Sequence, residues 1–350
     1  MNTDPAHFPL NAWYAAAYDV EVGRALFPRT VCQQKLVLYR QTDGRVAALE
    51  DACWHRLLPL SMGRLEGDEV VCGYHGLVFN AEGRCTHMPS QETLNPSACV
   101  RRFPVAEKHR FIWVWPGDPA LADESLIPDL HWNHDPAWAG DGKMIRVKCD
   151  YRLVIDNLMD LTHETYVHAT SIGQAEIDET PCTTRREGKT VVTSRFMESI
   201  EAPPFWLDAL RAIGVEGNPK VDRWQICRFS PPSHVLIEVG VALAGHGGYE
   251  APDDKKVYSV VTDFITPEVD GSMWYFWGMA RRFRPQDTEL TDRIRAGQGN
   301  IFSEDLQVLE RQQQNLEAFA QRKLLKLNID AGGVQARRVI DEHMAQEVTA

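Results

Sequence analysis

The chain has 350 residues, 44% of them hydrophobic, so it has enough apolar material to form two folded domains. Its net charge of −12 argues against nucleic acid and anionic membranes as partners. No apolar run is long enough to span a membrane, and the first residues lack the pattern of a signal peptide. Eight cysteines in a chain this long do not form a disulfide scaffold; six of them are scattered and predict buried thiols, which fits a reducing cytoplasm.

The first third of the chain reads as short strands separated by turns. Alternating or apolar runs predict strands at residues 35–39, 45–50, 69–72 and 111–115. Asp43-Gly44 and Glu82-Gly83 have the composition of tight turns. We expect a small antiparallel β-domain that Pro116-Gly117 closes, followed by a linker to about residue 140. Residues 1–140 are thus predicted to form one domain with its linker.

Two loops of this β-domain each combine a cysteine with a histidine. They read Cys53-Trp-His55 and Cys72-Gly-Tyr-His75. Such loops can hold a [2Fe–2S] cluster, with both thiolates on one iron and both imidazoles on the other. Zinc is the alternative, but structural zinc sites usually pair cysteine with cysteine and histidine with histidine. Since each loop here contains one of each, the spacing favours the cluster.

A second group of potential metal ligands follows at Asn157, Asp160, His163 and His168. Two histidines and a carboxylate on one face of an iron leave positions open for dioxygen and substrate. On an ideal helix a five-residue spacing separates two side chains by about 140°. The helix predicted over residues 150–168 must therefore bend, loosen or end between His163 and His168.

A candidate third ligand lies much later, in a segment that looks helical. Its apolar stripe consists of Phe302, Leu306, Leu309 and Leu316. Asp305 falls at the edge of this stripe, whereas Glu304 is expected to point away. A carboxylate turned toward a core needs a metal or a charged partner. A capping or salt-bridge role for Asp305 is the alternative to metal binding.

The second domain, residues 141–350, mixes strands with helices. The predicted strands of one antiparallel sheet are residues 223–229, 234–240, 257–264 and 272–278. Helices are predicted near residues 285–320 and at the C-terminus. The fold class is therefore α+β.

The two motifs resemble those of Rieske non-haem iron oxygenases, and the likeness extends over nearly the whole chain. It implies an N-terminal antiparallel β Rieske domain and a C-terminal catalytic domain of helix-grip type. Respiratory Rieske proteins carry an additional cysteine pair, at positions that are Leu58 and Tyr74 here, so that disulfide cannot form. Family members commonly have His-Arg-Gly in the first loop, whereas this chain has Leu57 in place of the glycine.

The resemblance also implies a role for each candidate residue. The [2Fe–2S] cluster would be held by Cys53, His55, Cys72 and His75. The mononuclear Fe(II) would be held by His163, His168 and Asp305. Asp160 would connect the cluster of one subunit to the iron of its neighbour in a homotrimer, and Asn157 would lie beside the iron.

The implied activity is that of a terminal monooxygenase supplied with electrons by a separate NAD(P)H-dependent, ferredoxin-type reductase. No segment of the chain resembles a flavin or nicotinamide site. The expected reaction is O-demethylation of a methoxylated aromatic acid such as vanillate. Hydroxylation or demethylation of another substituted benzoate (dicamba, veratrate or a toluenesulfonate) is the alternative. A Rieske-type electron carrier would need only the first domain, and ring dihydroxylation is the main enzymatic rival.

Overall fold

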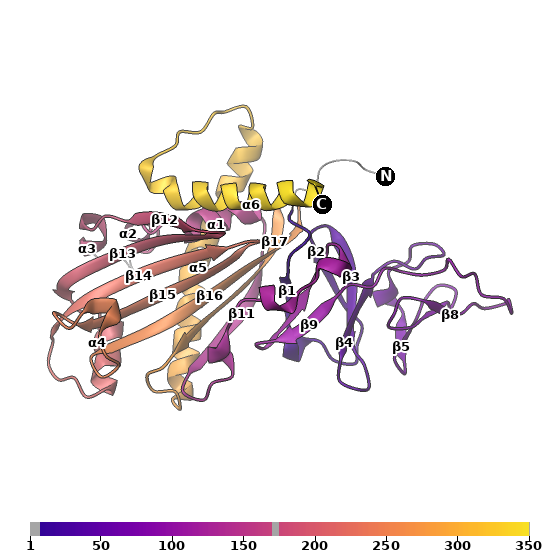
Figure 1. The fold of residues 1–350 in the computed structure, drawn as a ribbon, viewed down its shortest axis with the longest axis horizontal. Helices are drawn as coiled ribbons and strands as arrows, with labels where there is room; N and C mark the ends of the chain where they lie inside the picture. Colours follow the sequence, from indigo (N-terminus) through magenta and orange to yellow (C-terminus); the bar gives the residue numbers. More distant parts are fainter. Residues whose placement is uncertain (1–7, 170–174, 350) are drawn as a thin grey trace. The chain divides into compact units, whose positions relative to one another are not determined.

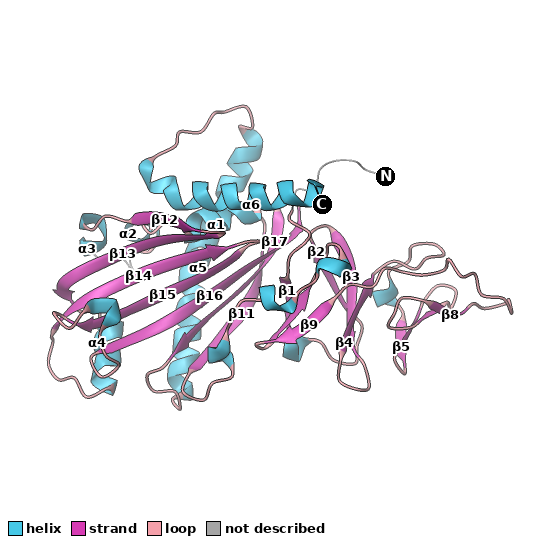
Figure 2. Ribbon diagram, in the orientation of Figure 1, coloured by secondary structure: helices cyan, strands magenta, loops and turns pink. Residues whose placement is uncertain are grey.

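The structure, a computed structural model, describes residues 8–169 and 175–349 (Figures 1 and 2). The chain divides into two compact units. The first comprises Met1–Asp129, Thr266–Asp270 and Glu347–Ala350, and the second comprises Leu130–Ile265 and Gly271–Gln346. The domain boundary expected between residues 140 and 141 stays a prediction.

The first unit contains three small antiparallel sheets, and each of its four predicted strands is confirmed. The strands of the first sheet are, in order, β1 (Tyr14–Tyr18), β10 (Phe111–Val114) and β9 (Val105–Lys108). Those of the second are β2 (Phe27–Val31), β3 (Gln34–Arg40) and β4 (Val46–Glu50). Those of the third are β5 (Arg64–Glu66), β6 (Glu69–Val71), β7 (Val78–Phe79) and β8 (Cys85–His87). The first Cys/His loop joins β4 to β5, and the second joins β6 to β7. Cys53 and Cys72 are buried in a hydrophobic core with Leu60, Val70 and Phe79.

The chain after β10 contains short 3-10 helices in place of an irregular linker. They span Pro119–Leu121, Glu124–Leu126 and His131–Asn133. Asp118 and Asp123 cap the first two, since each side chain accepts a hydrogen bond from a backbone N–H two residues later. The aspartates that suggested a linker therefore start helical turns.

The second unit is built on a seven-stranded antiparallel sheet (Figure 2). Its order is β11 (Ala139–Val147), β17 (Ser272–Arg281), β16 (Lys256–Val269), β15 (His234–Leu243), β14 (Lys220–Ser230), β13 (Thr190–Glu201) and β12 (Thr183–Glu187). The helices are α1 (Tyr151–Leu158), α2 (Glu164–Val167), α3 (Ala175–Glu179), α4 (Pro204–Ala212), α5 (Thr288–Ala318) and α6 (Ala331–Thr349). The four strands and two helices predicted for this domain are confirmed, whereas β11, β12, β13 and α4 were not predicted.

The prediction of a single helix over residues 150–168 is wrong. Asp150 caps α1, which ends at Leu158, and α2 begins only at Glu164. Between them the Asp160 carboxylate accepts hydrogen bonds from the backbone N–H and the hydroxyl of Thr162, at 2.7 and 2.6 Å. Such a side-chain turn competes with the helical hydrogen-bond ladder. The break therefore precedes His163 rather than falling between His163 and His168, which lie at the two ends of α2.

The long helix α5 runs across the sheet (Figure 1) and packs against β11 and β17. Asp287 caps it by accepting a hydrogen bond from the Leu290 N–H. Its buried stripe consists of Leu290, Ile294, Phe302, Asp305 and Leu309. One carboxylate is thus buried among apolar side chains, which is the position expected for Asp305.

The start of α6 lies directly against the end of α1. A Cβ atom on Gly332 would come within 2.4 Å of the Met159 carbonyl oxygen, so no other residue fits without a shift. Arg337 reinforces this contact with a forked ion pair to Asp156, in which the shortest N–O distance is 2.6 Å. None of the helices in the described part of the chain is long and apolar enough to cross a membrane.

Candidate metal centres and substrate cavity

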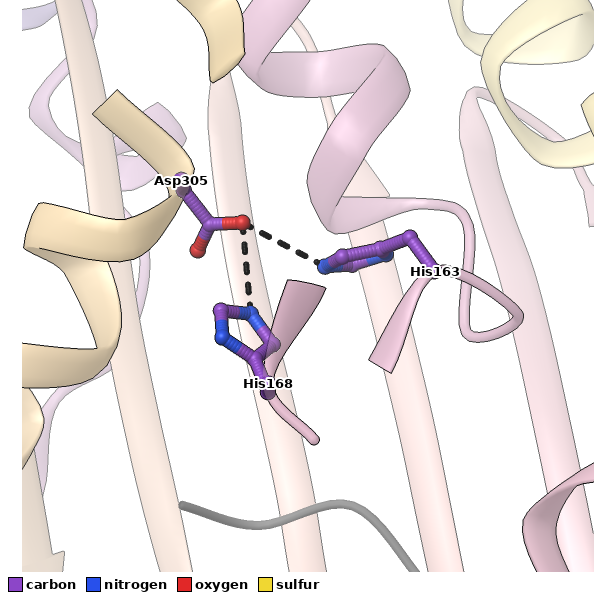
Figure 3. Close-up of side chains that lie close together, drawn as sticks. All are labelled: His163, His168 and Asp305. Atoms are coloured by element: carbon purple, nitrogen blue, oxygen red, sulfur yellow. Dashed lines mark ion pairs between the residues drawn. The ribbon is translucent and has the colours of Figure 1, made fainter. Parts of the chain in front are cut away.

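Three side chains from two separate parts of the chain converge in the second unit (Figure 3). The Asp305 Oδ1 atom lies 3.4 Å from the Nε2 atom of His163 and 3.2 Å from that of His168. All three potential ligand atoms lie within 4.8 Å of one another, a geometry that could hold one metal ion. Within the described ranges, no other group of three such residues meets this criterion.

The hydrogen bonds of both histidines leave the Nε2 atoms facing the potential metal position. The Nδ1 atom of His163 lies 2.6 Å from the Asp160 backbone carbonyl oxygen, and that of His168 lies 2.6 Å from the Glu304 carboxylate. A carbonyl oxygen only accepts, so the Nδ1 atom of His163 carries a proton and Nε2 is the nitrogen that faces Asp305. The Nδ1 atom of His168 likewise lies against a carboxylate oxygen of Glu304, so its Nε2 also faces Asp305. This is the usual outer-sphere arrangement of metal-binding histidines.

The expectation that Glu304 points away is therefore wrong. Glu304 and Asp305 are consecutive on α5, yet both contact His168 because its ring lies between them. The only signal in the sequence was that the two acids are adjacent. The apolar stripe only distinguishes the buried side of the helix from its exposed side. It could not show that the His168 ring lies between the side chains of Glu304 and Asp305.

The electrostatics at Asp305 favour a carboxylate over a carboxylic acid. Burial alone would raise the pKa of Asp305, but hydrogen bonds from His163 and His168 hold it at about 2. Burial also opposes protonation of both histidines, and Asp305 outweighs it, so that their pKa values are raised. Asn157 donates a hydrogen bond of 3.0 Å from Nδ2 to Asp305 Oδ1 and so helps to orient the carboxylate.

The first unit presents the other four candidate ligands as two pairs. The Cys53 and Cys72 thiols are buried next to one another, and burial raises the pKa of the Cys53 thiol to about 11. The exposed imidazole rings of His55 and His75 have centroids 4.5 Å apart. Two thiols that lie together and two imidazoles that lie together suit a cluster in which one iron is held by the thiolates and the other by the imidazoles.

The two loops have the same backbone plan. In each, the cysteine N–H donates to the carbonyl of the residue five positions later, and the cysteine carbonyl accepts from the residue four positions later. That latter residue has a positive φ in both loops, 58° at Leu57 and 73° at Gly76. Leu57 therefore occupies a left-handed conformation that glycine adopts without steric cost.

We expect the Leu57→Gly substitution to stabilise the first unit by about 1 kcal/mol, because it relieves this conformational penalty. The leucine side chain is 72% exposed, so little burial is lost. Gly76→Ala is the matched control and should destabilise, since it creates the penalty at the equivalent position. The urea midpoint for loss of the visible cluster absorption measures both effects. A lower urea midpoint for Leu57→Gly than for the native chain would show that the backbone conformation of Leu57 carries no such penalty.

A cavity of about 830 Å³ adjoins the His/His/Asp group within the second unit. His163, His168, Asn157, Asp160 and Asp305 all contribute to its wall. The rest is largely apolar and includes Leu161, Trp206, Ile237, Val239, Val261 and Phe302. A volume of this size accommodates a small aromatic molecule next to the potential metal position.

The sequence shows the same two-part organisation when it is compared with known proteins. The Rieske [2Fe-2S] domain model matches residues 12–104, and the model of the vanillate O-demethylase oxygenase C-terminal domain matches residues 147–346. The vanillate O-demethylase oxygenase subunit of Pseudomonas sp. (strain HR199 / DSM 7063) is 59% identical over 98% of this chain and 97% of its own length. The chain belongs to the family of vanillate O-demethylase oxygenase subunits.

This Rieske-type oxygenase has further relatives of known sequence and structure. The vanillate O-demethylase oxygenase subunit of Pseudomonas sp. (strain ATCC 19151) is 62% identical over 91% of this chain and 97% of its own length. The crystal structure of dicamba monooxygenase bound to 3,6-dichlorosalicylic acid matches with a TM-score of 0.89 and 34% identity, covering 98% of this chain and 99% of the other. The oxygenase thus has a Rieske [2Fe–2S] domain, and its His/His/Asp group suits a mononuclear iron.

Proposed function

We propose that the chain is the terminal oxygenase of a multicomponent monooxygenase that converts vanillate into protocatechuate and formaldehyde. The identity of 59% over nearly the whole chain with a vanillate O-demethylase oxygenase subunit carries this proposal. The cavity supports it, because an apolar chamber beside a His/His/Asp group can present a ring substituent to the metal.

In this proposal Cys53 and Cys72 hold one iron of the cluster, and His55 and His75 hold the other. The mononuclear iron is held by His163, His168 and Asp305. When bound, this iron supplies the activation of dioxygen once electrons reach it. Glu304 and the Asp160 carbonyl fix the orientation of the two imidazoles, and Asn157 fixes that of the Asp305 carboxylate.

The overall reaction balances as one methoxyarene, one O₂, two electrons and two protons giving one phenol, one formaldehyde and one water. The methyl C–H bond is replaced by C–OH, and the resulting hemiacetal breaks its O–CH₂ bond. The electrons come from NADH or NADPH through a separate ferredoxin-type reductase. None of the eight cysteines, all of which the structure describes, forms a disulfide, and this supports a reducing compartment such as the cytoplasm.

A homotrimer is proposed because electrons would pass from the cluster of one subunit to the iron of its neighbour. A hollow of about 1310 Å³ in the second unit is lined by Glu304, the partner of His168, and by Tyr166 and Leu324. Tyr166 is 81% exposed, and two apolar side chains of the same lining, Leu324 and Phe319, are 59% and 53% exposed. Exposed apolar side chains of this kind are typical of a surface that another protein covers.

We expect the purified chain, with NADH and a compatible reductase, to form one formaldehyde and one protocatechuate per O₂ consumed with vanillate. Product analysis and O₂ uptake measure this, with veratrate, isovanillate, syringate and dicamba as competing substrates. Preference for dicamba or veratrate would favour the alternative of another substituted benzoate. A ring-dihydroxylated product, or no turnover of any methoxyarene, would overturn the substrate proposal.

A further inference from the structure

We propose that Arg223 is the residue that binds the carboxylate of the aromatic substrate and thereby selects anionic over neutral methoxyarenes. This inference rests on the proposed function, since it names the group that orients a methoxybenzoate in the cavity already described.

The position of Arg223 follows from the alternation of side chains along β14. Arg223, Gln225 and Cys227 are two residues apart, so they project from one face of the sheet. All three line the cavity that His163, His168 and Asp305 also line. Trp224 and Ile226 belong to a separate hydrophobic cluster with Val192 and Ala242, as expected for the opposite face.

The charges around the cavity single out Arg223. Among the described residues, its walls include the carboxylates of Asp160, Glu164, Glu201, Asp208 and Asp305, and the guanidinium groups of Arg223 and Arg293. An anionic substrate would be repelled by the acids unless a cation offsets them. Arg293 lies on the exposed surface of α5, whereas Arg223 is only 8% exposed. A charge-assisted hydrogen bond is stronger where water is excluded, so Arg223 is the better anchor.

A buried polar network supports the strand at this point. Arg195 is 1% exposed and donates hydrogen bonds to Gln225 Oε1 and to the Leu161 carbonyl, at 3.2 and 2.9 Å. The Gln225 amide in turn donates to both oxygens of the buried Glu164 carboxylate, at 2.8 and 2.9 Å. Gln225, two residues from Arg223, is thus tied to Glu164, the neighbour of His163. The network thus holds the strand that carries Arg223 against the segment that carries His163.

Charges of both signs surround Arg223. Burial lowers the pKa of its guanidinium, Glu164 and Glu176 raise it, and Arg195 lowers it. A substrate carboxylate in the cavity would form a charge-assisted hydrogen bond with the guanidinium. The apolar side chains of Ile237 and Val239, on the paired strand β15, then contact the ring between the carboxylate and the metal.

The test compares the binding of vanillate with that of guaiacol, the same ring without the carboxylate. Quenching of tryptophan fluorescence reports occupancy, because Trp206 lines the cavity. We expect Arg223→Gln to weaken vanillate binding by about 10- to 100-fold, the usual range for one hydrogen bond to a charged group. Guaiacol binding should change by less than about twofold, which is small beside that range. Arg223→Lys should restore part of the vanillate affinity, since it keeps the charge.

The control is Arg228→Gln, on the same strand but the opposite face, where Arg228 pairs with Glu238 at 2.6 Å. It should leave both affinities unchanged. Iron and sulfide contents show whether each variant is folded. If Arg223→Gln does not fold, Arg223→Lys and the native preference for vanillate over guaiacol carry the comparison. If Arg223→Gln weakens the binding of vanillate and guaiacol equally, or of neither, Arg223 does not bind the carboxylate. The proposed function would still stand if the native chain demethylates vanillate. Failure of the native chain to demethylate any methoxybenzoate would instead overturn the proposed function.

Discussion

Asp305→Ala should remove the mononuclear iron and leave the [2Fe–2S] cluster in place. The iron content would fall from about three atoms per chain to about two, with acid-labile sulfide unchanged. The reason is that the Asp305 carboxylate lies within 3.4 Å of both Nε2 atoms, whereas the cluster residues lie in the other unit. Metal analysis and the visible spectrum measure the two centres separately, and turnover should be lost.

Glu304→Gln, at the residue before Asp305, should weaken iron binding without abolishing it. Glu304 contacts His168 through Nδ1, on the side of the ring away from the potential metal position. Its loss should weaken iron binding by about 10- to 100-fold, the usual effect of an outer-sphere partner. Cys72→Ser is the converse variant and should lose cluster colour while keeping the mononuclear iron. Full iron content in Asp305→Ala would show that another residue completes the site.

Asp160→Asn should retain both metal centres and reduce turnover by about a hundredfold, as expected when an outer-sphere carboxylate is lost. Asparagine keeps the oxygen that accepts from Thr162, and the backbone carbonyl that accepts from His163 is untouched. The substitution therefore removes the negative charge and little else. Single-turnover reduction of the iron, monitored after the cluster has been reduced, distinguishes slow electron transfer from slow chemistry.

Mixed oligomers test whether the transfer crosses between subunits. Neither Cys72→Ser nor His163→Ala should turn over alone. Coexpressed, they should form trimers in which an intact cluster on one subunit lies next to an intact iron on another, and part of the activity should return. Activity of a strictly monomeric native enzyme, or near-native turnover by Asp160→Asn, would exclude this role for Asp160.

The sequence predicted the elements whose side chains follow a simple period. The strands at 223–229 and 257–264 alternate or run apolar, and the stripe of α5 placed Asp305 at its buried edge. The ligand motifs were equally visible because cysteine, histidine and aspartate at short spacing have few other uses. The ligand assignments themselves stay predictions until metal analysis tests them.

The apolar pattern of the sequence did not predict features that depend on side-chain hydrogen bonds, whether local or between distant segments. The turn at Asp160 ended the helix because a side chain competed with the backbone, which an apolar pattern does not register. Glu304 reaches His168 although its place on the helix suggested solvent. Gln225 gave no signal, since its partners Arg195 and Glu164 come from other parts of the chain.

The contact between Gly332 and Met159 defines how much of the chain the iron centre needs. Met159 directly precedes Asp160, whose carbonyl orients His163, so the backbone that α6 touches is continuous with the backbone that holds the imidazole. The C-terminal helix is therefore a wall of the metal-binding turn rather than an appendage after the last ligand. A fragment that stopped at the end of α5 would contain every proposed iron ligand and still lack the surface that fixes one of them in place.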